Sequence, residues 1–322
     1  MKMTLRLSAL FLALVSTVQS GSAFEWGDTE GKYLDLKQGS RSIARYVYEP
    51  IDESTPERRE ETYKPFCHIF QPGSSEQFLT KGPGGKFTHH RGIFYGFSRI
   101  SYTDKDGEKH EKVDTWHCRD AHQVHRKFLK QEADKDSASF TALIVWIGKD
   151  GNGFATEERT MRFKMENSDI VVDFESKLTS TVPMLQIDGD PQHAGFQFRA
   201  NNDVSEKHSN ATYYIRPESG AGPAGATINW SSKTDTEQTR DIPWKAMCMT
   251  LGDKRYTISY LDRPTNPKPA RFSERDYGRF GSYFATEVPK DEPLEVRYRL
   301  VIHSGELKAE SVAKLSEQYL SE

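Results

Sequence analysis

The sequence predicts an all-β protein, an antiparallel β-sandwich or supersandwich of about fourteen strands with a short C-terminal helix. Three observations support this fold class. From residue 30 onward, short runs rich in Val, Ile, Phe, Tyr and Thr alternate with connectors rich in Gly, Pro, Asp, Asn and Lys. Apolar and polar residues alternate within several runs, so that Ile170, Val172 and Phe174 face one side of a strand. Aromatic residues make up 11% of the chain, which suits a sheet-rich protein.

The N-terminal residues 1–23 are typical of a secretory signal segment. Positive charge at Lys2 and Arg6 precedes an apolar run over residues 7–15 and the small residues 21–23. We therefore expect an exported protein, periplasmic or secreted, whose mature chain begins at Phe24. Because no later apolar run reaches about 20 residues, no membrane span is expected after cleavage.

Residues 24–322 show no internal repeat and no long linker, so we expect one β-sandwich domain. Helical periodicity is convincing only over residues 307–320. Gly, Asp and Asn between the apolar runs supply the turns. The expected strands are 33–36, 42–48, 66–71, 93–102, 124–131, 139–147, 157–164, 170–178, 197–200, 211–216, 245–251, 254–261, 281–284 and 294–303.

Composition and missing motifs argue against several function classes. The formal net charge is −3 without a basic run, so no nucleic-acid partner is expected. The chain lacks GxSxG, HExxH, P-loop and EF-hand patterns, which removes the usual support for hydrolase-fold, zincin, P-loop nucleotide and EF-hand calcium assignments. Cys67, Cys118 and Cys248 are odd in number and form no CxxC, so one disulfide plus a thiol and three thiols are both open.

A histidine pair, His89 and His90, followed by Arg91, is the first candidate for chemistry. The Gly-rich segment 82–85 before it indicates a loop that leads into an apolar strand. Neighbouring side chains of a regular strand point to opposite faces, so both imidazoles can reach one ligand only if the backbone turns there. Otherwise one faces the site and the other supports it. Exposed loop histidines, or one hydrogen-bonded core histidine, are the alternative.

A second polar cluster covers residues 114–120 and joins Trp116 to titratable groups. His122 and His125 follow, and they would share one face only in a helix. The pattern over 124–131 favours a strand, so HxxH is not interpreted as a metal motif. The alternative is a solvated connector in which Trp116 packs as core.

A third cluster runs over residues 186–199 between two expected strands and ends at Arg199. Asp188, Asp190 and His193 are candidates for an acid/base pair or a mixed oxygen and nitrogen metal site. The spacing does not decide between these, because DxDxxH has no fixed ligand geometry. A turn in which the aspartates bond their own backbone is equally consistent.

Two more clusters lie at 262–269 and 273–280. Prolines stiffen the first loop, which can hold Asn266 for a ligand at low entropic cost. In the second, Arg275 and Arg279 can fork onto a carboxylate, sulfate or phosphate, beside Asp276 and Tyr277. The alternative is a surface ion-pair network between Arg275 and its neighbour Glu274.

The ordered series of these motifs resembles the DUF6807 family, which carries the label methane oxygenase PmoA. The resemblance covers roughly residues 40–305. It implies an exported β-sandwich of galactose-mutarotase-like or jelly-roll type, similar to sugar-active proteins; a membrane oxygenase subunit would need several apolar spans. The motifs that carry it are Tyr63–Phe66, Gln71–Gly73, His89–Gly92, Asp114–Trp116, Asp190–Phe196, Arg263–Pro267, Arg275–Gly278 and Tyr298–Gly305.

Three functions follow as hypotheses. The leading one is a carbohydrate-active enzyme of hydrolase, lyase or isomerase type, in which His90, His193 and Tyr277 are catalytic and a saccharide or other small polar ligand is the partner. A non-catalytic glycan-binding module is the second. The third is a metal-dependent oxidoreductase; no residue is assigned as a metal ligand, but copper, iron or zinc at the histidines stays open. The expected substrate-binding residues are His89, Arg91, Trp116, His125, Arg199, Asn266, Arg275 and Asp276.

Overall fold

The computed structural model describes residues 22–190, 192–233 and 235–322. The expected signal segment lies outside these residues except for Ser22 and Ala23, and the first strand begins at Phe24. No helix within the described ranges is long and apolar enough to cross a membrane.

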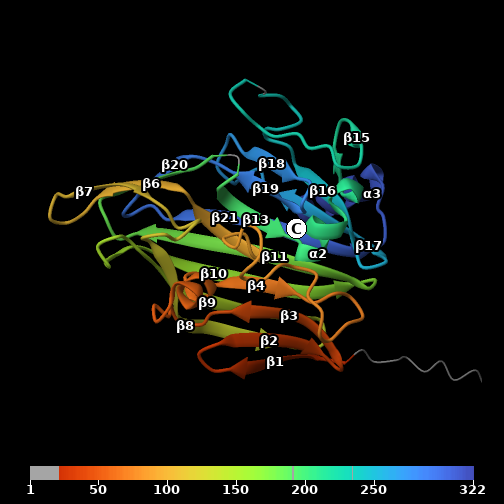
Figure 1. The fold of residues 1–322 in the computed structure, drawn as a ribbon, viewed down its shortest axis with the longest axis horizontal. Coiled ribbons are helices and arrows are strands. Elements are labelled where there is room, and N and C mark those ends of the chain that lie inside the picture. The colour runs from red at the N-terminus through yellow and green to blue at the C-terminus, as the bar shows by residue number, and fades with distance from the viewer. Residues whose placement is uncertain (1–21, 191, 234) are drawn as a thin grey trace, which may run out of the picture.

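Two large antiparallel sheets and one small sheet form the protein (Figure 1). The prediction of an antiparallel β-sandwich with a C-terminal helix is therefore confirmed. The eight-stranded sheet has the order β1 (Phe24–Thr29), β2 (Tyr33–Gln38), β3 (Arg41–Val47), β4 (Phe66–Ile69), β5 (Ile93–Phe97), β13 (Ala194–Arg199), β19 (Arg279–Tyr283), β18 (Arg271–Arg275). The nine-stranded sheet has the order β15 (Gly220–Ala221), β14 (Tyr213–Arg216), β16 (Trp244–Leu251), β17 (Lys254–Asp262), β21 (Leu294–Ser304), β11 (Asp169–Ser180), β10 (Gly153–Glu166), β9 (Ser137–Ile147), β8 (His122–Ala133). The four-stranded sheet has the order β20 (Thr286–Pro289), β12 (Met184–Asp188), β6 (Arg99–Thr103), β7 (Lys109–Val113). The helices are α1 (Pro56–Thr62), α2 (Asn202–Lys207), the 3₁₀ turn η1 (Ser209–Ala211) and α3 (Ala309–Ser321).

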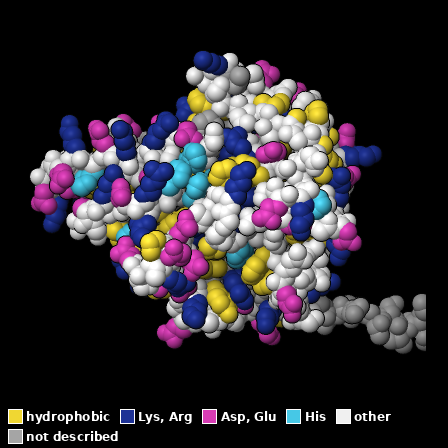
Figure 2. Space-filling model, in the orientation of Figure 1, with side chains coloured by type: hydrophobic (Ala, Val, Ile, Leu, Met, Phe, Trp, Pro, Cys, Tyr) yellow, Lys and Arg dark blue, Asp and Glu magenta, His cyan; other side chains and the backbone are white. Residues whose placement is uncertain are grey.

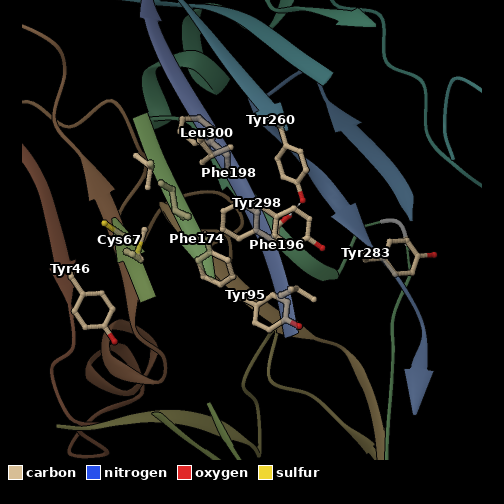
Figure 3. Packing of buried hydrophobic residues seen from close by; sticks show 14 of the residues in the cluster. Tyr46, Cys67, Tyr95, Phe174, Phe196, Phe198, Tyr260, Tyr283, Tyr298 and Leu300 are labelled. Carbon is tan, nitrogen blue, oxygen red and sulfur yellow. Dashed lines mark hydrogen bonds between the residues drawn. The ribbon is translucent and has the colours of Figure 1, made fainter. Parts of the chain in front are cut away.

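The main core lies between the two large sheets and is rich in aromatic rings. Phe174 of β11 stacks on Phe196 of β13 with ring centroids 4.3 Å apart, and Phe196 stacks on Tyr298 of β21 at 4.9 Å (Figure 3). Ile170 and Val172 are buried in the same cluster, as the alternation predicts, whereas Val171 faces the other side and packs in the cluster under α3. Helix α3 therefore covers the outer face of the nine-stranded sheet.

One expected strand is wrong in an informative way. Residues 93–102 form two strands, β5 and β6, which belong to different sheets and are separated at Ser98. The Ser98 N–H donates to the carbonyl of His193 (3.1 Å), which lies just before β13 in the longer connector from β12. Because apolar residues continue through the break, the sequence pattern alone does not reveal it.

The same strands place the candidate site on the outer face of the eight-stranded sheet. Tyr95 and Phe97 point into the main core, so by strand alternation Phe94 and Gly96 face the other way. Phe94 packs there in a separate buried cluster with Phe66 and Trp116. Connectors before β5, after β7 and before β13 converge over this face.

Candidate metal centre

The loop before β5 turns sharply enough to bring both histidines of the pair together. Gly84 and Gly85 have φ of +80° and +64°, and the His90 N–H donates to the Phe87 carbonyl (2.9 Å). The Lys81 ammonium holds the loop by donating to the carbonyls of Gly82 (2.9 Å) and Gly84 (2.5 Å). The rings of His89 and His90 are consequently only 4.2 Å apart between centroids.

The connector after β7 presents a third imidazole, on His117. Asp114 caps a short turn, since its Oδ1 accepts from the backbone N–H groups of Trp116 and His117, both at 2.8 Å. Its Oδ2 accepts from Nδ1 of the His117 ring at 2.7 Å. Burial opposes ionisation of Asp114, but the hydrogen bonds from His117 and the turn lower its pKa. Because an ionised carboxylate only accepts, Nδ1 carries the proton, and in the neutral form of the ring Nε2 has a lone pair.

The connector before β13 repeats this arrangement with Asp190 and His193. The carboxylate of Asp190 accepts from the Gln192 N–H (2.8 Å) and from Nδ1 of the His193 ring (3.0 Å). Burial opposes ionisation of Asp190, whereas these hydrogen bonds lower its pKa to about 2. Asp188, the last residue of β12, instead accepts from the backbone N–H of its neighbour Gly189 (2.7 Å) and bonds no ring.

Three loops thus deliver His89, His117 and His193 to one place. Ring centroids are 4.4 Å apart for His89 and His117, 4.5 Å for His117 and His193, and 5.7 Å for His89 and His193. One ring nitrogen from each lies within 4.8 Å of the other two. Figure 2 shows histidine side chains gathered on this face, with Lys and Arg beside them. We call these three residues the histidine cluster.

Buried cationic groups adjoin the His89 and His90 side of the histidine cluster. Burial, followed by the neighbouring His117 and Lys64, lowers the pKa of His89 to about 2. Burial and then Arg279 hold the pKa of His90 well below its usual range. Burial also lowers the pKa of Lys64, whose ammonium donates to the Trp116 carbonyl, to about 7. Neutral imidazoles in this position have lone pairs available for a cation.

Two of the other predicted site residues adjoin the cluster. His90 is 1% exposed, and its ring lies parallel to that of Tyr277 at 6.2 Å. Tyr277 in turn contacts the 38% exposed ring of Phe87 at 4.9 Å and the guanidinium of Arg199, also at 4.9 Å.

Most of the remaining predicted residues make contacts away from the cluster; Trp116 is the exception, with its ring 5.5 Å from that of His90 and 6.2 Å from that of His193. Arg91 is buried and donates to the carbonyls of Glu60, Glu61 and Thr88, and Trp116 is buried beneath the cluster. His125 contacts the rings of Tyr46 and Tyr48. Asn266 bonds Asp262 and the Arg297 carbonyl, and Arg275 bonds Asn229. Asp276 is exposed. All three cysteines are free and buried.

Sequence reasoning did not single out His117 or Asp114, and it named Asp190 with His193 only as a candidate acid/base pair or metal site. A signal was present, because Asp114 and His117 have the same DxxH spacing as Asp190 and His193. In both turns the carboxylate reaches the ring three residues later.

The protein is therefore an antiparallel β-sandwich that carries a histidine cluster on the outer face of one sheet. The chain belongs to DUF6807, a family of unknown function, whose model matches residues 33–317. This confirms the family predicted from the motif series. No curated protein matches the chain.

The chain is also similar to several solved structures. A galactose mutarotase related enzyme from Lactobacillus acidophilus has 8% identity and a TM-score of 0.40, with 89% of this chain and 99% of that chain covered. An aldose epimerase homologue from C. elegans has 7% identity and a TM-score of 0.36, with 88% and 100% covered. The galactosidase domain of an α-galactosidase–sucrose kinase has 11% identity and a TM-score of 0.42, with 88% of this chain covered. This chain spans 42% of the length of that protein.

Proposed function

We propose that the protein is a metal-dependent enzyme that acts on a saccharide, with His89, His117 and His193 as the metal ligands. The observation that supports it most directly is the convergence of three ring nitrogens within 4.8 Å of one another. Metal–imidazole bonds of about 2.0–2.1 Å join nitrogens up to about 4 Å apart, so a bound ion would draw the rings slightly together. Three protein ligands leave a coordination position open for substrate or water, as in catalytic zinc sites.

The partners of the three imidazoles support this assignment. Asp114 and Asp190 each accept from Nδ1, which leaves Nε2 of His117 and His193 available. A carboxylate behind a ligating imidazole orients the ring and increases its basicity. His89 contributes a buried Nε2 that has no hydrogen-bond partner. An unpartnered buried nitrogen is costly, and a metal ion would satisfy it.

The residues around the cluster support a role in binding and proton transfer. A bound divalent ion such as Zn²⁺ would polarise a substrate oxygen or lower the pKa of bound water. His90 adjoins His89, and neither of its ring nitrogens has a partner, so it can exchange a hydrogen bond or proton with the substrate. The rings of Phe87 and Tyr277 form an aromatic wall on which the apolar face of a sugar can pack.

Metal analysis tests the proposal without requiring a known substrate. We expect protein purified without chelators and dialysed against zinc to hold about one zinc per chain by mass spectrometry, and His117→Ala to hold at least tenfold less. His125→Ala should retain the zinc, because His125 contacts Tyr48 and not the histidine cluster. Equal zinc in wild type and His117→Ala would contradict the assignment.

The same measurements separate the other functions considered. Stoichiometric copper or iron in the wild type would favour an oxidoreductase, because both metals bind imidazole and carry redox chemistry. Sugar binding that is indifferent to zinc and to His90→Ala, without product, would favour a glycan-binding module.

A further inference from the structure

Three arginines lie side by side on the outer face of the eight-stranded sheet. Arg199 of β13 is the register partner of Arg279 of β19, which is in turn the partner of Arg275 of β18. Like charges directly opposite one another destabilise a sheet. Burial first, and the nearby Arg279 as well, lower the pKa of Arg199 to about 10. The row is therefore a concentration of positive charge, on which Glu206 acts electrostatically at Arg199.

Arg199 and Arg279 leave the same edge of the guanidinium without a partner. Nη1 of Arg199 donates to the Tyr277 carbonyl, and Nη1 of Arg279 donates to Gln197 Oε1 (2.8 Å) and Ser273 Oγ (3.0 Å). Nε and Nη2 of both side chains are buried without a hydrogen-bond partner, although both residues are 0% exposed. Nε and Nη2 together form the fork that matches a carboxylate or sulfate with two parallel hydrogen bonds.

In four other arginines of this protein, that edge is occupied by a carboxylate, although the Nε atoms of Arg91, Arg263 and Arg271 also have no hydrogen-bond partner. The buried Arg159 places Nε and Nη2 on the two oxygens of Glu157, both at 2.8 Å. The same fork occurs in Arg45 with Asp35, Arg216 with Glu274, and Arg299 with Asp173. Compared with these four, Arg199 and Arg279 are held in place by Nη1, and no carboxylate of the described residues bonds their Nε and Nη2.

The arginine edges adjoin the histidine cluster. Tyr277 lies between Arg199 and His90, at 4.9 Å and 6.2 Å from ring centroids. His90 adds two unpartnered buried nitrogens and lies 4.2 Å from the ring of His89. We propose that Arg199, Arg279 and His90 form an oxyanion subsite, so that the substrate is a saccharide bearing a carboxylate or sulfate group. The inference rests on the proposed function only in taking the anion to be part of the substrate.

The test uses the full chain in chelator, so that it does not depend on the metal. Sodium glucuronate, glucose and sodium sulfate are titrated by calorimetry at constant ionic strength. We expect glucuronate and sulfate to bind and glucose not to bind. Arg199→Lys and Arg279→Lys keep the charge but lose the fork, and each should weaken glucuronate binding at least tenfold. Arg45→Lys, whose fork is filled by Asp35, should bind as the wild type does.

The outcomes separate the sources of the anion and the two proposals. Sulfate binding as tight as glucuronate shows that the oxyanion alone is recognised, and tighter glucuronate shows that the sugar contributes; both support the subsite. Equal binding of glucose and glucuronate, or unchanged affinity in both lysine variants, would overturn it. If the variants do not fold, selenate soaked into wild-type crystals should give an anomalous peak at the two free forks, and its absence overturns the subsite. Zinc content is measured separately, so either proposal can fail alone.

Discussion

Two residues, Asp114 and Asp190, do most to prepare the histidine cluster. Each caps a turn with its backbone contacts and also holds Nδ1 of the histidine three residues later. The turn fixes the position of the ring, and the ring hydrogen bond fixes which nitrogen is available. One short sequence pattern, DxxH, therefore sets both the place and the tautomer of a ligand.

Replacing Asp114 with Asn should weaken zinc binding while preserving the turn. The amide oxygen can still cap the turn, but it is neutral and supports the His117 ring less strongly, so we expect a 10–100-fold loss in zinc affinity. Asp188→Asn is the matched control, because Asp188 bonds its own backbone neighbour and no ring. Competition with a chromophoric chelator measures both. An equal loss in the two variants would mean that the Asp114–His117 bond has no special role.

At the scale of the elements, the site lies where the chain passes between the eight-stranded sheet and the four-stranded sheet. β5 continues into β6, and β12 into β13, and the break at Ser98 is bonded to the His193 carbonyl (3.1 Å). Gly96 of β5 has no side chain, so the turn that carries His117 can pack closely against the outer face of the sheet. A Cβ at Gly96 would lie 2.7 Å from the Thr115 carbonyl oxygen, in the turn that carries His117.

Gly96→Ala should therefore affect the centre more than the fold. We expect about 1–3 kcal/mol of destabilisation from the overpacked contact, together with a loss of zinc affinity as the Thr115 turn is displaced. Gly27→Ala on β1 is the control, because a Cβ there meets nothing within 4 Å. Urea unfolding and zinc titration are the measurements. Unchanged zinc affinity in a destabilised Gly96→Ala protein would show that the turn is positioned by other contacts.

For the molecule as a whole, the strand pattern was predictable and the site was only partly so. Alternation over residues 170–178 defines β11 and its buried face, because burial of one side is a local property. The short strands β7 and β20 carry few apolar residues and were not predicted, and β12, which is only five residues long, was not predicted either. Sequence spacing also carries no information about which loops meet across sheets. His117 therefore was not assigned to the site, while His125 was, although it lies on β8, the next strand along the chain, in the nine-stranded sheet.

Stability of the whole molecule should fall on acidification, because histidines are buried in neutral form. Burial, and then nearby Arg45, lowers the pKa of His68 to about 3. Between pH 6.5 and 3 the unfolded chain binds a proton there and the folded chain does not, so stability rises with pH in this window and is lost as pH falls. This contribution is on the order of a few kcal/mol.

His68→Gln should reduce that dependence. The amide keeps a partner for Thr80, which bonds the His68 ring at 2.9 Å, but does not titrate. We expect the free energy of unfolding, from urea titrations at several pH values, to fall less steeply below pH 6.5 than in the wild type. Identical slopes would show that His68 is not one of the groups responsible.

The central claim is that three imidazoles from three loops hold one metal ion. X-ray absorption spectroscopy of the zinc-loaded protein tests it most directly. We expect three imidazole ligands at about 2.0–2.1 Å in the wild type, and one fewer in His193→Ala. Zinc coordinated without imidazole, or an identical spectrum in the wild type and in His193→Ala, would contradict the claim.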